Sequence, residues 1–63
     1  MSGNYFKMDI NIAYSILNMR LRDKYPDLEE LCQVENINKD NLIQYFERNG
    51  FIYDISKNQF VMK

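Results

Sequence analysis

The one cysteine is the best nucleophile that the sequence offers, and the chain has no histidine to activate it. Cys32 follows Leu28 and Leu31 at the spacing of one helical face, so we expect it to be a small buried core residue. A reactive thiol needs an exposed and electropositive setting, which these apolar neighbours do not indicate. The sequence therefore predicts no catalytic residue and no enzymatic activity.

Clustered acidic side chains are the usual ligands of hard metal ions. The closest group in the sequence comprises Asp23, Asp27, Glu29 and Glu30. These positions coincide with expected helix ends, where carboxylates cap the helix and interact with its dipole. The lack of histidine and the single cysteine exclude the usual zinc ligand sets. The two glycines, Gly3 and Gly50, form no phosphate-binding loop, so we expect neither a metal site nor a cofactor.

The segment 39–49 carries amide and guanidinium side chains, which pair well with base edges in nucleic acid. The candidate nucleic-acid contacts are Lys39, Asn41, Gln44, Arg48 and Lys57, the last at the tip of an expected hairpin. Asp40 and Glu47 share the outward face of the segment and would repel phosphate. The formal net charge of −1 also differs from the strongly basic balance typical of dedicated nucleic-acid binders. Nucleic acid is therefore a partner that the sequence allows but does not favour.

A second group of cations comprises Arg20, Arg22 and Lys24 in the segment 9–24. Asp23 dilutes this charge, and the three side chains point in different directions around a helix. Arg22 lies beside Asp23 near an expected helix C-terminus, where a cation is favoured. We expect these three residues to lie on a solvated surface.

A chain of 63 residues is long enough for a single domain, 1–63, at the small end of what folds alone. Domains of this size bury only about 60% of the surface that the unfolded chain exposes. With one cysteine, no intrachain disulfide can add stability. The hydrophobic content of 46% indicates a packed core, so stability must come from packing or from self-association.

The chain carries no signal for a membrane or for export. No apolar run approaches the roughly 18 residues of a membrane-spanning helix. The first residues, MSGNYFKM, lack the basic start and apolar stretch of a signal peptide. Together with a free thiol, this pattern predicts a cytoplasmic protein without membrane contact.

The segment 9–24 reads as a helix with Asp9 as N-cap and Pro26 just beyond its end. Its main apolar face comprises Ile10, Ala13, Tyr14, Leu17, Leu21 and Tyr25. A second apolar face lies on roughly the opposite side and comprises Ile12, Ile16 and Met19. A helix that is apolar on two sides is either central in its domain or shared with another subunit.

The remaining elements are a helix over 27–35, a helix over 39–49 and a β-hairpin over 51–62. Asp27 and Asn38 are suitable N-caps, and Asn36 and Gly50 suit positions of positive φ. If Asp54 pairs with Gln59 across the hairpin, the residues 55–58 form its turn. The segment 1–8 precedes the first helix.

The hairpin has apolar residues on both sides. Ile52 and Val61 face away from the aromatic side that we expect in the core. Together with Ile12, Ile16 and Met19 they are candidate contacts with a protein partner or a second copy of the chain. Alternatively, the residues 4–8 cover these faces, for example as a third strand beside the hairpin. The sequence leaves both explanations open.

The stretch 28–46 resembles a helix-turn-helix unit. The small Cys32 stands where two helices cross closely, Asn36 is at the turn, Ile37 follows at its buried corner, and Leu42 lies in the second helix. Asn36 replaces the usual glycine, and Glu35 stands where an apolar residue is more common. With a helix before it and a hairpin after it, the unit predicts an α+β, mostly helical, winged-helix-like fold.

The segment 9–60 also resembles a family of short bacterial proteins known as domain of unknown function 4250. The resemblance rests on Ser15, Asn18, Leu21, Arg22, Asp23, Leu28, Leu31, Cys32, Asp40, Leu42, Gly50, Tyr53, Asp54, Asn58, Gln59 and Phe60. It departs at Ile10, where the family often has proline. The resemblance implies a free-standing bacterial cytoplasmic protein and brings no activity with it.

These observations predict a non-enzymatic interaction or regulatory module. We expect its partner to be a protein or a second copy of the chain. The alternative is helix-turn-helix binding of nucleic acid through the helix 39–49 and the hairpin tip.

Overall fold

The computed structural model describes residues 5–63, which form three helices and a hairpin. In chain order the elements are α1 (Ile10–Asp23), α2 (Leu28–Val34), α3 (Lys39–Arg48), β1 (Phe51–Asp54) and β2 (Gln59–Met62). This order confirms the predicted α+β class with three helices followed by a C-terminal hairpin, and the outline is that of a small winged helix.

Each helix begins at a side chain that accepts a hydrogen bond from the first turn. The Asp9 carboxylate accepts from the amide of residue 11 at 2.8 Å, and the Asp27 carboxylate accepts from the amide of residue 30 at 2.8 Å. Asn38 accepts from the amide of residue 41 at 2.9 Å. The three predicted N-caps are therefore confirmed, and each satisfies a backbone donor that has no partner within its helix.

Three residues adopt the left-handed backbone conformation that the chain needs in order to change direction. Asn36 has a φ of 59° between α2 and α3, Gly50 has a φ of 91° between α3 and β1, and Asn58 has a φ of 53° in the hairpin turn. Asparagine and glycine are the residues that adopt this conformation at least cost.

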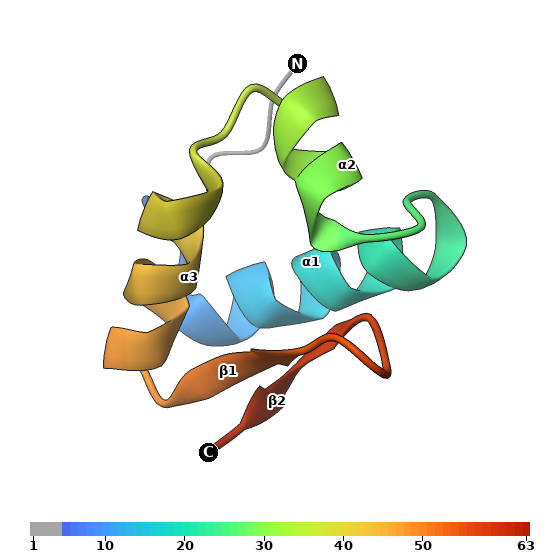
Figure 1. Ribbon diagram of the computed structural model, residues 1–63. Coiled ribbons are helices and arrows are strands. Elements are labelled where there is room, and N and C mark those ends of the chain that lie inside the picture. The colour runs from blue at the N-terminus through green and yellow to red at the C-terminus, as the bar shows by residue number, and fades with distance from the viewer. Residues whose placement is uncertain (1–4) are drawn as a thin grey trace.

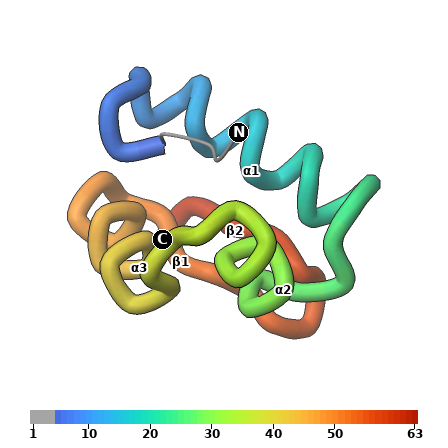
Figure 2. Tube along the Cα trace, turned by 90° about the horizontal axis from the view of Figure 1, so that it is seen from above, coloured from blue at the N-terminus to red at the C-terminus, as the bar shows by residue number. Residues whose placement is uncertain are grey.

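Figure 1 shows α1 running behind α2, α3 and the hairpin, which lie nearer to the viewer. The view from above in Figure 2 separates α1 from the layer that contains the other elements. α1 is therefore the support against which the helix-turn-helix unit and the hairpin both pack.

The hairpin is antiparallel, and Asp54 is the partner of Gln59, as predicted. The Asp54 carboxylate accepts hydrogen bonds from the Ser56 amide at 3.0 Å and the Ser56 hydroxyl at 2.6 Å, which fixes the turn 55–58. The sheet has two strands, β1 and β2. The suggestion of a third strand from the N-terminal segment is wrong for residues 5–8, which form turns and bends, and residue 4 lies outside the described residues.

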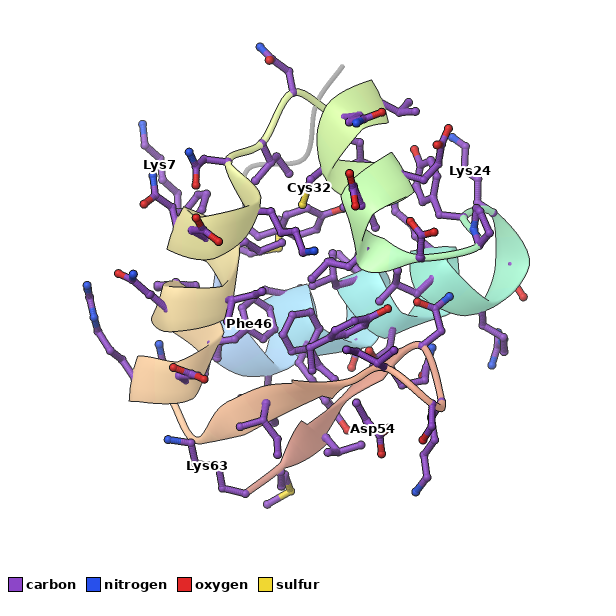
Figure 3. The ribbon with its side chains drawn as sticks, in the orientation of Figure 1. Lys7, Lys24, Cys32, Phe46, Asp54 and Lys63 are labelled. Atoms are coloured by element: carbon purple, nitrogen blue, oxygen red, sulfur yellow. The ribbon has the colours of Figure 1, made fainter. Side chains whose placement is uncertain are left out.

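The core lies where α1, α2, α3 and one face of the hairpin meet. Its buried residues are Tyr5, Ala13, Leu17, Leu21, Tyr25, Leu28, Leu31, Cys32, Leu42, Phe46, Phe51 and Phe60. The Phe46 ring projects from α3 to the hairpin, where its centroid is 4.5 Å from that of Phe60 (Figure 3). Cys32 is buried as predicted, and burial raises the pKa of its thiol.

Candidate functional site

Glu35, in the turn between α2 and α3, is the centre of a buried polar cluster. Its carboxylate accepts hydrogen bonds from the hydroxyls of Tyr5 at 2.8 Å and Tyr25 at 3.0 Å. The Arg20 guanidinium lies 3.1 Å from it and forms an ion pair. The prediction of a solvated Arg20 is therefore wrong, because this side chain leans from α1 toward a carboxylate that is only 6% exposed.

The electrostatics of the cluster keep both tyrosines protonated. Burial, and then the hydrogen bond to the Glu35 carboxylate, raise the pKa of the Tyr5 hydroxyl far above its ordinary value, and the pKa of Tyr25 is raised for the same reasons. Burial by itself would lower the pKa of Arg20, but its two oxygen partners outweigh burial and raise it. The cluster of protonated donors around the Glu35 side chain joins α1 and residue 5 to the turn between α2 and α3.

Amide side chains form a second polar joint, between α1 and the hairpin. The Asn18 side chain donates to the Phe60 carbonyl at 2.9 Å and accepts from the Phe60 amide at 2.7 Å. The Asn58 side chain donates to the carbonyls of Leu21 at 3.1 Å and Tyr25 at 3.2 Å. Asn18 therefore pairs the outward backbone groups of Phe60 in β2, and Asn58 satisfies one carbonyl in the last turn of α1 and one just beyond its end.

Asn18 and Asn58, the amide residues of this joint, are among the residues on which the family resemblance rests. The model described as a domain of unknown function (DUF4250) matches residues 7–60. The chain belongs to the DUF4250 family. No curated protein and no solved structure matches the chain. The description of the DUF4250 family names no function.

The candidate nucleic-acid contacts do not share one surface. Asn41, Gln44 and Arg48 lie together on α3, where they line a shallow hollow of about 310 Å³ with an aromatic pair. Lys39 lines a different groove on the other side of α3. Lys57 belongs to the hairpin turn, which lies across the molecule from α3 in both views (Figures 1 and 2). The structure thus brings three of the five residues together.

The aromatic pair in that hollow, Phe6 and Tyr45, was not expected from the sequence. The two rings meet edge to face with their centroids 5.2 Å apart. Phe6 belongs to the N-terminal segment and Tyr45 to α3, so this contact ties residues 5–8 to the helix-turn-helix unit. Of the described residues, 5–8 therefore pack on α3 through Phe6, and Ile12 on the second apolar face of α1 is 54% exposed.

The candidate protein-interface residues fall into two patches. Ile12 and Met19 are exposed on α1, whereas Ile16 is half-buried and packs against the core. Ile52 and Val61 are partners across the hairpin. These residues therefore lie on two different elements of the fold, and their role in an interface stays a prediction.

A groove of about 370 Å³ opens between the start of α2, the side of α3 and β1, and we call it the α2–α3–β1 groove. Its apolar lining comprises Leu28, Ile43, Ile52, Tyr53 and Ile55. Its charged lining comprises Asp27, Glu29, Lys39 and Glu47. The groove therefore combines an apolar floor with an excess of carboxylates over ammonium groups.

Ile55 is the groove residue that sequence reasoning missed. It is 82% exposed in the hairpin turn, a position at which most proteins carry a polar residue. The sequence could have indicated it, because an isoleucine inside a four-residue turn cannot reach the core and must lie on the surface. Together with the 38% exposed Ile52, it exposes apolar side chains to solvent on the hairpin side of the groove.

Tyr53 fixes one wall of the groove. Its hydroxyl accepts a hydrogen bond from the Leu28 amide at 3.3 Å and donates one to the Asn58 side chain at 2.5 Å. The first of these satisfies a free donor at the start of α2. The hairpin and α2 are therefore held at a fixed separation, and the groove between them is preformed.

Other classes of site find no support in residues 5–63. Within this range no three cysteine or acidic side chains are grouped so that they could hold a metal ion. None of the helices described for these residues has the length and apolar character needed to cross a bilayer.

Proposed function

We propose that this protein is a non-enzymatic interaction module that binds a segment of a partner protein in the α2–α3–β1 groove. The observation that carries the proposal is the apolar lining of the groove. It includes the 82% exposed Ile55 of the hairpin turn and Ile52 of β1, which lie beside Leu28 and Ile43 in one groove. Contiguous apolar surface beside polar rims is typical of docking sites.

The chemistry of the titratable groups supports a non-enzymatic role. Burial raises the pKa of the Cys32 thiol, which lowers the fraction of reactive thiolate at neutral pH. The hydroxyls of Tyr5 and Tyr25 are tied to a carboxylate and stay protonated. Neither kind of group is activated as a nucleophile or a general base.

Binding of nucleic acid through α3 is the competing proposal. The acidic residues of the helix stand against it, since Asp40 directly precedes Asn41 and Glu47 directly precedes Arg48 in the sequence. The hairpin turn also lies across the molecule from α3, so Lys57 does not extend the surface that carries Arg48 (Figures 1 and 2). Loss of these phosphate contacts weakens such binding strongly, because phosphate neutralisation supplies most of the affinity.

A site-specific photo-crosslinker tests the proposal in cells that express the chain. The reactive amino acid replaces Ile55 in the groove or, as a matched control, Val34, an exposed aliphatic residue of α2 that does not line the groove. We expect a discrete protein adduct from position 55 and none from position 34. Equal adducts from both positions would contradict a groove-specific function.

A third crosslinker position tests the competing proposal. Gln44 lies on the α3 surface where a duplex would bind. Nuclease-sensitive adducts from position 44 would favour nucleic acid over protein as the partner. Titration of generic duplex DNA at low salt, followed through backbone amide shifts of α3 and residues 55–58, provides the same distinction in vitro.

A further inference from the structure

The hydrogen-bond register of the hairpin determines which backbone groups of β1 point outward. The Lys63 amide donates to the Gly50 carbonyl at 2.9 Å, so this pair is hydrogen-bonded across the hairpin. In an antiparallel ladder such pairs alternate with pairs that are not bonded to each other. From the register, Phe51 and Tyr53 therefore direct their N–H and C=O groups away from β2.

The two edges of the hairpin are treated differently by the fold. On β2, the outward groups of Phe60 are both paired with the Asn18 side chain. On β1, the outward groups of Phe51 and Tyr53 have no hydrogen-bond partner among residues 5–63. The β2 edge is thus closed at Phe60 by a side chain of α1, whereas the β1 edge presents donors and acceptors in the pattern that a further strand would need.

The α2–α3–β1 groove lies beside this open edge at Ile52 and Tyr53. Ile52 and Tyr53 are consecutive in β1, so their side chains point to opposite faces of the sheet. Both nevertheless line the groove, whereas no residue of β2 does. A hollow that touches both faces of one strand lies beside the strand's edge, in the plane of the sheet.

We infer that the groove binds an extended segment of a partner protein as a third strand on β1. This inference rests on the proposed function and adds the mode of binding and the chemistry of the partner. Backbone hydrogen bonds to Phe51 and Tyr53 supply register, and alternate side chains of the segment enter the apolar groove beside Ile43 and Ile55. The arrangement is strand addition beside a helix.

The charge of the groove determines which charge the bound segment should carry beside its apolar residues. Asp27, Glu29 and Glu47 surround the groove against the single ammonium group of Lys39. The segment therefore carries lysine or arginine next to its apolar positions. A second copy of the chain fits poorly, because pairing two β1 edges would bring two acidic rims together at short range.

Selection from a display library of random short peptides tests the inference on the full chain. We expect enriched peptides to alternate apolar residues and to carry lysine or arginine. In the complex, the Phe51 and Tyr53 amides should gain protection from hydrogen exchange, since they become bonded. Light scattering of the free chain at several concentrations should show a monomer.

Backbone methylation of a synthetic selected peptide separates strand addition from simple filling of the groove. N-methyl groups on alternate residues whose amides face β1 should reduce the affinity at least about tenfold, because each removes a hydrogen bond. The same modification shifted by one residue faces solvent and should change the affinity little. This alternation follows from the period of two along a strand.

Charge reversal on the protein tests the partner chemistry. Glu47→Lys should weaken binding by about three- to tenfold, as for loss and reversal of an exposed ion pair. Glu30→Lys makes the same change at an exposed residue of α2 that does not line the groove and is the matched control. Equal effects of both variants would overturn the inference that the partner segment is basic.

Each remaining outcome has a definite meaning. Peptides that bind in the groove with no sensitivity to the position of methylation overturn strand addition and leave the proposed function standing. A dimer in which the Phe51 and Tyr53 amides are protected from hydrogen exchange without peptide overturns the inference that the partner is a different protein. No enriched peptide, or binding that is unaffected by Ile55→Ser, overturns both proposals.

Discussion

Replacing Asn18 with leucine should loosen the hairpin from α1 and destabilise the whole domain. The substitution keeps the size of the side chain and removes its hydrogen bonds of 2.9 and 2.7 Å to the Phe60 backbone. Each backbone group then stays part-buried without a partner, at a cost of about 1–2 kcal/mol. The expected loss of about 2–4 kcal/mol is large beside the roughly 3–5 kcal/mol that a core of this size supplies.

Thermal and urea unfolding measure this loss. For a domain of this length each kcal/mol corresponds to roughly 4–8 °C, so the midpoint should fall by roughly 10–25 °C. Ser15→Ala is the matched control, because Ser15 lies one turn earlier on α1, is exposed and belongs to the same family pattern. A midpoint for Asn18→Leu within about 3 °C of that control would refute the reasoning.

Asn18→Asp tests the direction of the two bonds. A carboxylate at this position can still accept from the Phe60 amide, but it faces the Phe60 carbonyl with a second acceptor. The protonated carboxyl restores a donor, so the folded state should hold the proton more tightly than the unfolded state. Stability then falls as pH rises above the unfolded pKa of about 4, whereas the Asn18→Leu variant shows no such dependence.

Three further perturbations have defined outcomes. Glu35→Ala removes the carboxylate that accepts from two tyrosine hydroxyls and pairs with the Arg20 guanidinium, which keeps the Tyr5 hydroxyl as an acceptor, and urea unfolding followed by circular dichroism should show a loss of about 3–5 kcal/mol, enough to unfold the chain. The raised pKa values of Tyr5 and Tyr25 mean that the unfolded state releases phenolic protons first, so urea titrations should show stability falling above about pH 10, and less so in a double phenylalanine variant. The hydrogen bond from a turn hydroxyl lowers the pKa of Asp54, so its contribution is present near neutral pH and is lost in acid below about pH 4, a loss that Asp54→Ala should abolish in acid titrations of the hairpin amides.

Local rules were sufficient to predict the elements and their ends. Asp9, Asp27 and Asn38 cap their helices, and Asn36 and Gly50 take positive φ, because these effects act within a few residues of the chain. The expected hairpin register also followed from local turn chemistry. Periodicity identified the core in the same way, since burial on one face is a property of each helix by itself.

The polar joints could not be predicted, because they connect residues far apart in the sequence. Arg20 and Glu35 are 15 residues apart, and Asn18 and Phe60 are 42 apart. Their types suit a solvated surface equally well, and only the packing of α1 against the other elements brings them together. The one available signal was Glu35 at a turn position that is usually apolar, which indicates a carboxylate with buried partners.

The two edges of the hairpin connect stability with the proposed function. An isolated two-stranded hairpin is marginal in water, so this one depends on α1 for support. Asn18 provides that support at β2, where its bonds replace those of a third strand. The same fixation holds β1 in place while its outer edge faces the groove, with Tyr53 bound to the start of α2. A hairpin anchored at one edge can accept a strand at the other without rearranging the fold, whereas a nucleic-acid wing would need its tip to project beside α3.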